Sequence, residues 1–119
     1  MLLKGGIFML NQVVFVGRLT KDPEIITSES GKKRTRIIVA VNRGFKNMDG
    51  IYETDFIPCI LWNAVAENTC EYCHKGDIIG VKGRIQTSSV EDEKGYKNYV
   101  EIIAEKITFL SSKKQETDD

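Results

Sequence analysis

Aromatic and basic side chains are interleaved along residues 37–62 of this 119-residue chain. Phe45, Phe56 and Trp62 alternate there with Arg43 and Lys46. Aromatic rings stack on flat ligands, and Lys and Arg attract negative charge, so the mixture suits a ligand that has both properties. Single-stranded nucleic acid is the common biological case. We expect the strands of this stretch to place the three rings near one another.

The residue types needed for catalysis are sparse. The chain has a single His, and its pattern places no basic partner beside a Ser or Cys nucleophile. Asp49, Glu53 and Asp55 lie close enough in sequence to suggest a carboxylate pair for metal-assisted cleavage of nucleic acid. However, Asp49 falls in an expected turn, Asp55 falls on an expected strand, and no further acidic ligand is within reach. We therefore predict no enzyme activity, no catalytic residue and no cofactor.

Residues 70–74 spell C-x-x-C-H, the pattern of covalent haem attachment. This pattern lies inside an expected helix of a strand-rich chain without an export signal, which argues against haem. A zinc site would draw on Cys59, Cys70, Cys73 and His74. One C-x-x-C pair with an adjacent Cys and His is weak spacing for a structural zinc site. We expect ordinary packed thiols and no metal.

Length and composition indicate one globular domain with short tails. The formal net charge is zero, but residues 1–89 hold 12 Lys and Arg against 9 Asp and Glu, and residues 90–119 hold 5 against 8. A basic body with an acidic last quarter suits a polyanionic partner, because a local patch matters more than the total charge. The chain has three cysteines, an odd number, and we see no convincing export signal and no apolar run of about 20 residues. We therefore expect a cytoplasmic, nucleoid-associated protein without a membrane partner.

Hydrophobic periodicity predicts the order strand, strand, strand, helix, strand, strand. We expect strands over residues 11–19, 33–42, 54–62, 78–87 and 98–110, and a helix over residues 63–74 that Asn63 caps and Gly76 ends. In the second strand, Arg34 and Arg36 alternate with an apolar face. Five short strands with one helix between the third and fourth predict an all-β OB-fold, a Greek-key barrel that binds oligonucleotides across its second and third strands. An open sheet with one packed helix has the same element order.

Four segments resemble the bacterial single-stranded-DNA-binding protein family. They are N-Q-V-V-F-V-G-R-L at residues 11–19 with D-P-E at 22–24, A-V-N-R-G-F at 40–45, T-D-F-I-P-C at 54–59, and A-E-N at 66–68 leading to K-G at 75–76. The resemblance implies an OB-fold that assembles as a homotetramer and binds single-stranded DNA without sequence preference in replication, recombination and repair. It places base-stacking aromatics at Phe45, Phe56 and Trp62, and basic positions at Arg18, Arg43 and Lys75.

The predicted DNA-binding residues therefore combine the three rings with cations from the expected strands and loops. The cations are Arg18, Arg34, Arg36, Arg43, Lys46, Lys75, Lys82 and Arg84. Arg34, Arg36, Lys82 and Arg84 fit a solvated sheet face equally well, and each ring has core packing as its alternative. The predicted domain spans residues 9–110, between an extension over 1–8 and a short polar, acidic tail over 111–119.

Two departures from the family pattern affect these expectations. The hairpin between the fourth and fifth strands usually carries a further aromatic and several basic residues, but residues 88–93 read S-S-V-E-D-E, so that arm should hold DNA less well. Most members of the family also have a long tail with an acidic and hydrophobic tip, which recruits replication and repair proteins. This sequence lacks that tail, so we expect either a truncated piece or a short relative. A single-stranded RNA binder and a replication-complex subunit whose aromatics form the core remain as alternative functions.

Overall fold

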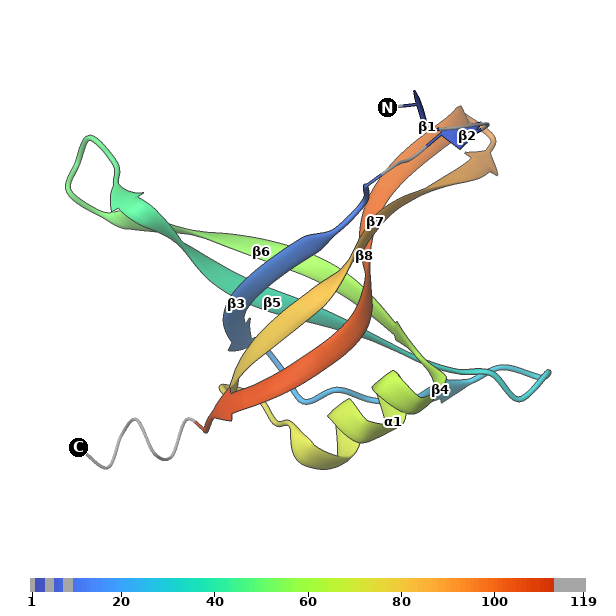
Figure 1. Cartoon of the computed structure of the whole chain (residues 1–119), viewed down its shortest axis with the longest axis horizontal. Helices are drawn as coiled ribbons and strands as arrows, with labels where there is room; N and C mark the ends of the chain where they lie inside the picture. The colour runs from blue at the N-terminus through green and yellow to red at the C-terminus, as the bar shows by residue number, and fades with distance from the viewer. Residues whose placement is uncertain (1, 4–5, 8–9, 113–119) are drawn as a thin grey trace.

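Five strands close into a barrel in the computed structural model, which describes residues 2–3, 6–7 and 10–112 (Figure 1). The strands are β3 (Val13–Leu19), β5 (Lys33–Lys46), β6 (Tyr52–Trp62), β7 (Ile78–Asp92) and β8 (Gly95–Ser111). They follow the order β3-β7-β8-β6-β5, and a short β3–β5 pairing closes the ring. The pairings are antiparallel except that of β6 with β8, which is parallel. The predicted OB-fold is confirmed.

Among the described residues, three shorter strands lie outside the ring. β4 (Ile26–Thr27) pairs with the start of β5. β1 (Leu2–Leu3) and β2 (Gly6–Ile7) pair with each other in a separate two-stranded sheet within the expected N-terminal extension. Most of the expected tail lies outside the described residues, because the described part of the chain ends at residue 112.

The core follows the two-residue period of the strands. Ile37 and Val39 of β5 point inward, as the alternation predicts, and they meet Cys59 and Leu61 of β6. The same inner cluster contains Leu19, Ile79, Val81, Ala104, Ala66 and Cys73. Because the inward positions of β5 and β6 are odd-numbered, their even-numbered side chains face away from the core. This assignment decides which side of the two strands can meet a ligand.

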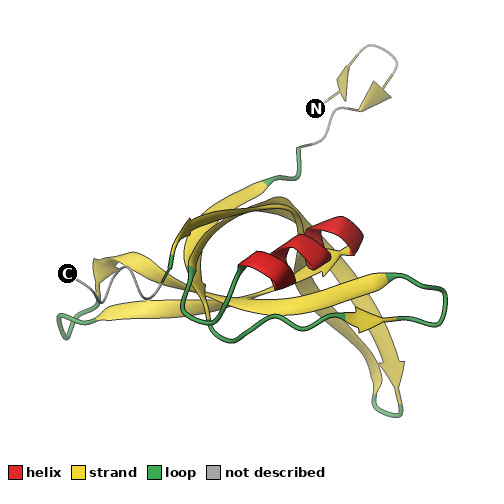
Figure 2. Ribbon diagram, turned by 90° about the horizontal axis from the view of Figure 1, so that it is seen from below, coloured by secondary structure: helices red, strands yellow, loops and turns green. Residues whose placement is uncertain are grey.

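Helix α1 (Asn63–Tyr72) connects β6 to β7 and lies against one end of the barrel (Figure 2). It buries Ala66 and Thr69. The prediction that Asn63 caps the helix is wrong: Trp62 occupies the cap position without a side-chain hydrogen bond, and Asn63 has a φ of 51°. The Asn63 amide oxygen instead accepts a hydrogen bond from the backbone N–H of Lys33 at 3.3 Å, which ties the helix start to β5. No helix among the described residues is long and apolar enough to cross a membrane.

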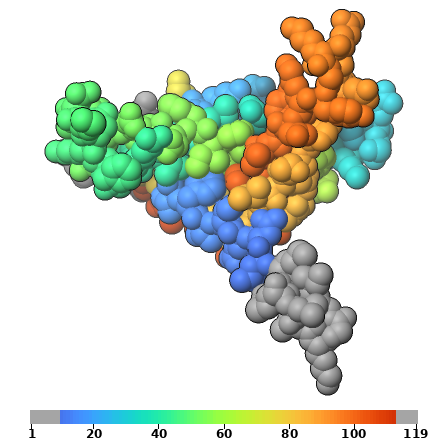
Figure 3. Space-filling view, turned by 90° about the horizontal axis from the view of Figure 1, so that it is seen from above, coloured from blue at the N-terminus to red at the C-terminus, as the bar shows by residue number. Residues whose placement is uncertain are grey.

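β5–β6 and β7–β8 extend beyond the barrel as two-stranded ribbons, which project on different sides of the body (Figures 1 and 3). The expected strands were too short here, because ribbons with two solvated faces lose the apolar alternation that marks a strand. Each ribbon ends in a turn with a glycine at positive φ, Gly50 at 78° and Gly95 at 110°. β5 reaches Lys46 instead of residue 42, and β7 reaches Asp92 instead of residue 87.

Candidate nucleic-acid interface

The outer face of the paired strands β5 and β6 carries two of the three aromatic rings that the sequence singled out, Phe56 and Trp62. The register places Arg34 opposite Trp62, and Ala40 opposite Phe56. Phe56 is 64% exposed and Trp62 is 40% exposed, so neither ring is part of the buried core. The guanidinium of Arg34 lies 6.0 Å from the centroid of the Trp62 ring. Both rings are therefore available to a ligand, and one already has a cation beside it.

The expectation that the three rings lie near one another is wrong. Phe56 and Trp62 are six residues apart on an extended strand, which corresponds to roughly 20 Å. Phe45 lies farther out, in the irregular stretch between the Asn42–Thr54 and Lys46–Tyr52 pairs, and is 69% exposed. The rings are spaced along the ribbon, so a ligand that contacts all of them must be an extended chain.

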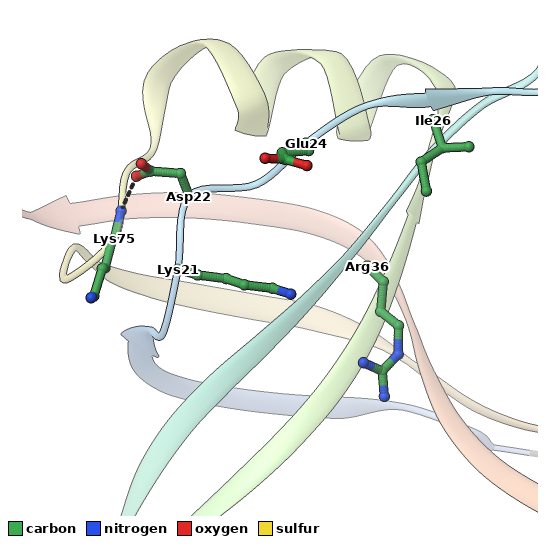
Figure 4. Close-up of a pocket in the computed structure, with 6 residues that line it drawn as sticks. All are labelled: Lys21, Asp22, Glu24, Ile26, Arg36 and Lys75. Carbon is green, nitrogen blue, oxygen red and sulfur yellow. Dashed lines mark hydrogen bonds between the residues drawn. The ribbon is translucent and has the colours of Figure 1, made fainter.

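Three adjoining hollows run across this face and into the second ribbon. One of about 160 Å³ is lined by Ile26, Ser28, Lys32, Arg34 and Trp62. A second of about 410 Å³ shares Ile26 and is lined also by Lys21, Asp22, Glu24, Arg36 and Lys75 (Figure 4). A third of about 300 Å³ shares Arg36 and is lined also by Pro58, Ser88, Tyr99, Val100 and Glu101. We call the three together the basic trough.

Positive charge is in excess along the basic trough. Its five cations are Lys21, Lys32, Arg34, Arg36 and Lys75, and its three carboxylates are Asp22, Glu24 and Glu101. Asp22 already accepts a hydrogen bond of 2.7 Å from the backbone N–H of Lys75, which holds the loop after α1 against the loop after β3 (Figure 4). Lys21 extends toward Arg36 across the middle hollow (Figure 4). A chain with regularly spaced negative charges matches this surface.

Arg43, one of the predicted phosphate contacts, faces the other side of the ribbon. Its guanidinium donates to Asp55 at 2.9 Å and to Glu53 at 2.5 Å. The hydrogen bond from Arg43 and its charge hold the pKa of Asp55 below the ordinary carboxyl value. Glu53 and Asp55 are odd-numbered and thus lie opposite the face of Phe56. Arg43 therefore pairs with two carboxylates on the face of the ribbon away from Phe56.

The structure also keeps three other predicted cations away from the basic trough. Arg18 donates a hydrogen bond of 2.7 Å to the carbonyl of Gly76 and so supports the loop after α1. Lys82 and Arg84 are on β7 and line none of the three hollows. Arg84 donates to the side-chain oxygen of Gln86 at 2.7 Å. Of the predicted cations, the trough collects Arg34, Arg36 and Lys75, and the β5–β6 ribbon carries Lys46.

Sequence analysis missed Lys21, Lys32 and Tyr99. Lys21 and Lys32 lie between the expected strands over residues 11–19 and 33–42, a segment to which no binding role was assigned. We expected no aromatic residue on the β7–β8 arm because residues 88–93, in its first strand, contain none. The returning strand carries Tyr96 and Tyr99, both exposed, and the register places Tyr99 opposite Ser88. Two tyrosines in the returning half of a predicted hairpin were the available signal.

The cysteines take the packed role that the sequence favoured. Cys59 and Cys73 are buried, and Cys70 is partly buried at the end of α1. Burial raises the pKa of Cys59 to about 12 and raises the pKa of Cys70 and Cys73 above their ordinary value. The raised pKa values reflect the desolvation of packed thiols. Within the described residues, no group of three or more His, Cys, Asp and Glu side chains is placed to hold a metal ion.

Comparisons with known proteins point to one family. Residues 10–110 match the model of the single-strand binding protein family. The chain is 48% identical over 109 residues to the single-stranded DNA-binding protein B of Bacillus subtilis, covering 91% of this chain and 96% of the relative. It is also 48% identical to the single-stranded DNA-binding protein 3 of Listeria innocua, a match that covers 88% of this chain and 66% of that relative. Its identity to the single-stranded DNA-binding protein of Lactiplantibacillus plantarum is 42%, over 88% of this chain and 53% of that relative. With the family model matched along most of its length, the chain belongs to the single-strand binding protein family.

Proposed function

We propose that this chain binds single-stranded DNA without sequence preference along the basic trough. The observation that carries the proposal is the trough itself, which combines five cations with Trp62 in one outer hollow and Tyr99 in the other. Membership of the single-strand binding protein family supports it. Every base has a flat face, and every nucleotide carries a phosphate, so this arrangement accepts any sequence.

Stacking and charge contribute in different ways to this binding. A base stacked on an aromatic ring contributes about 1–3 kcal/mol. Phosphate contacts release counterions, which makes the affinity fall as the salt concentration rises. We propose Phe45, Phe56, Trp62 and Tyr99 as stacking residues and Arg34, Arg36, Lys21, Lys32, Lys46 and Lys75 as phosphate contacts. We assign smaller roles to four other cations, which line none of the three hollows: Arg18, Arg43, Lys82 and Arg84.

The wider role follows from the family. We propose that residues 9–110 form the DNA-binding domain, with an extension over 1–8 and a tail over 111–119. The protein protects single-stranded DNA in replication, recombination and repair, works in the cytoplasm at the nucleoid and assembles as a homotetramer. It acts as a binding protein and not as an enzyme.

Binding of a labelled oligothymidine, followed by fluorescence anisotropy at a series of salt concentrations, tests the proposal. We expect affinity that falls with salt in a log–log plot and that exceeds the affinity for a duplex of the same length. The affinity for an oligouridine of the same length, measured in the same way, distinguishes DNA binding from RNA binding. Salt-independent binding, or tighter binding of the RNA, would contradict the proposed function.

Replacing Arg36 with alanine should reduce the salt dependence itself. Arg36 lines two of the three hollows, so it is placed to contact a phosphate at the centre of the path. Each phosphate contact to a single strand contributes about 0.7 to the slope of log affinity against log salt. We expect Arg36→Ala to lower the slope by about that amount. Lys106→Ala is the matched control, because Lys106 is an exposed cation that lines a hollow beside α1 instead, and it should leave the slope unchanged.

A further inference from the structure

Tyr52 and Lys46 form an exposed pair at the outer end of the β5–β6 ribbon. They are directly opposite each other in the register, and the Lys46 ammonium lies 5.6 Å from the centroid of the Tyr52 ring. Tyr52 is 55% exposed. Neither residue lines the basic trough, and sequence analysis assigned no role to Tyr52. The pair thus combines, away from the trough, the two groups that bind a nucleotide there.

The Tyr52 ring lies on the same face of the ribbon as Phe56. Tyr52, Thr54 and Phe56 are even-numbered residues of one strand, so their side chains share the outer face. Four residues of extended strand place Tyr52 roughly 13 Å beyond Phe56. The opposite face is occupied by the ion pairs of Arg43 with Glu53 and Asp55. The path of rings from Trp62 through Phe56 therefore continues in the same direction to Tyr52.

The turn between Lys46 and Tyr52 holds the pair in place. The side-chain oxygen of Asn47 accepts hydrogen bonds from the backbone N–H groups of Asp49 at 2.9 Å and Ile51 at 3.0 Å. The backbone N–H of Asn47 also donates to the carbonyl of Ile51 at 2.8 Å. On the other side of the pair, Thr54 donates to the side-chain oxygen of Asn42 at 2.8 Å. A ring on a braced hairpin loses little freedom when a ligand binds, which favours binding.

We propose that Tyr52 is a further stacking residue, which forms a nucleotide-binding subsite with the phosphate contact Lys46 at the outer end of the β5–β6 ribbon. A base stacks on the Tyr52 ring, and the Lys46 ammonium contacts the phosphate of the same nucleotide. The ligand class is a single-stranded polynucleotide long enough to pass from the basic trough to the end of the ribbon. This inference rests on the proposed function, since the subsite is occupied by a strand that the trough already holds.

The test compares oligothymidines of increasing length with Tyr52→Ala and Tyr52→Phe. An oligomer that fills only the trough should bind Tyr52→Ala as it binds the unchanged protein. For oligomers long enough to reach the ribbon end, one lost stack should lower the affinity about fivefold or more and reduce the number of nucleotides bound per chain. Tyr52→Phe keeps the ring and should bind like the unchanged protein at every length. Tyr72→Ala removes an exposed aromatic at the end of α1 and is the matched control.

The outcomes separate the subsite from the proposed function. If the unchanged protein binds and Tyr52→Ala binds the long oligomers equally well, the subsite is contradicted and the function stands. If Tyr52 only stabilises the hairpin, Tyr52→Ala should lower the melting temperature and weaken binding equally at every length, which also contradicts the subsite. If the unchanged protein binds no oligothymidine, the proposed function itself fails. A length-dependent loss that Tyr52→Phe restores supports the subsite.

Discussion

Replacing both Phe56 and Trp62 with alanine should weaken oligothymidine binding by about 30-fold or more, the largest loss we expect from two substitutions. Each ring provides a stacking surface worth about 1–3 kcal/mol. Their positions on β6 are roughly 20 Å apart, and effects of sites this distant normally add. The double variant should therefore lose the sum of the two single losses. Equilibrium titration of the two single variants and the double variant measures this directly.

The controls for this experiment address folding and surface hydrophobicity. Phe56 is well exposed, so its removal should leave stability nearly unchanged. Trp62 occupies the cap position of α1, so Trp62→Ala needs a parallel unfolding measurement, and Trp62→Phe keeps a ring there. Tyr72→Ala removes a ring that is 65% exposed outside the trough and should bind normally. Unchanged affinity in a folded double variant would contradict the assignment of these rings to the DNA path.

Gly17→Ala should destabilise the barrel by about 1–3 kcal/mol or more, because it overpacks the closure between β3 and β5. A Cβ atom at Gly17 would lie 2.5 Å from the carbonyl oxygen of Ala40 and 2.6 Å from Cγ1 of Val39. The two pairs that join β3 to β5, Arg18 with Ala40 and Leu19 with Val39, are immediately adjacent. The clash involves backbone, so a change of rotamer cannot relieve it. Denaturant unfolding measures the loss.

Gly80→Ala is the matched control for the closure. Gly80 is also a strand glycine of the barrel, but the nearest atom to its added Cβ would be Cβ of Thr108 at 3.7 Å, an ordinary contact. We expect a much smaller change in the free energy of unfolding than for Gly17→Ala. Equal destabilisation by the two substitutions would show that the close β3–β5 approach is not the cause.

The fold was predictable because its strands inside the barrel have one buried face. The alternation of Ile37 and Val39 with Arg34 and Arg36 is visible in the sequence, and the structure places the first pair in the core and the second outside. The outward ends of the ribbons have no such contrast, so their length was underestimated. The Asn63 error has a similar local origin: Asn is a good capping residue, but here the β6–α1 corner needs its side chain to hold β5.

The candidate site was only partly predictable because it is assembled by barrel closure. Arg36 comes from β5, Lys75 follows α1, and Tyr99 is on β8, yet the adjoining hollows bring them to one surface. The spacing of these three residues in the sequence does not reveal that they share one surface. The ion pairs of Arg43 are hidden for the same reason, since they depend on the β5–β6 register. A basic residue in sequence is a candidate contact, and its neighbours in the fold decide whether its charge is available.

The most direct measurement is the fluorescence of Trp62, the only tryptophan of the chain, during titration with oligothymidine at low and high salt. Trp62 is partly exposed at one end of the basic trough, beside the Arg34 guanidinium. Stacking on a base should quench its fluorescence, and more oligomer should be needed for the same quenching at high salt. Fluorescence that stays unchanged while the oligomer is bound would contradict stacking at Trp62. Unchanged fluorescence without any binding would contradict the proposed function as a whole.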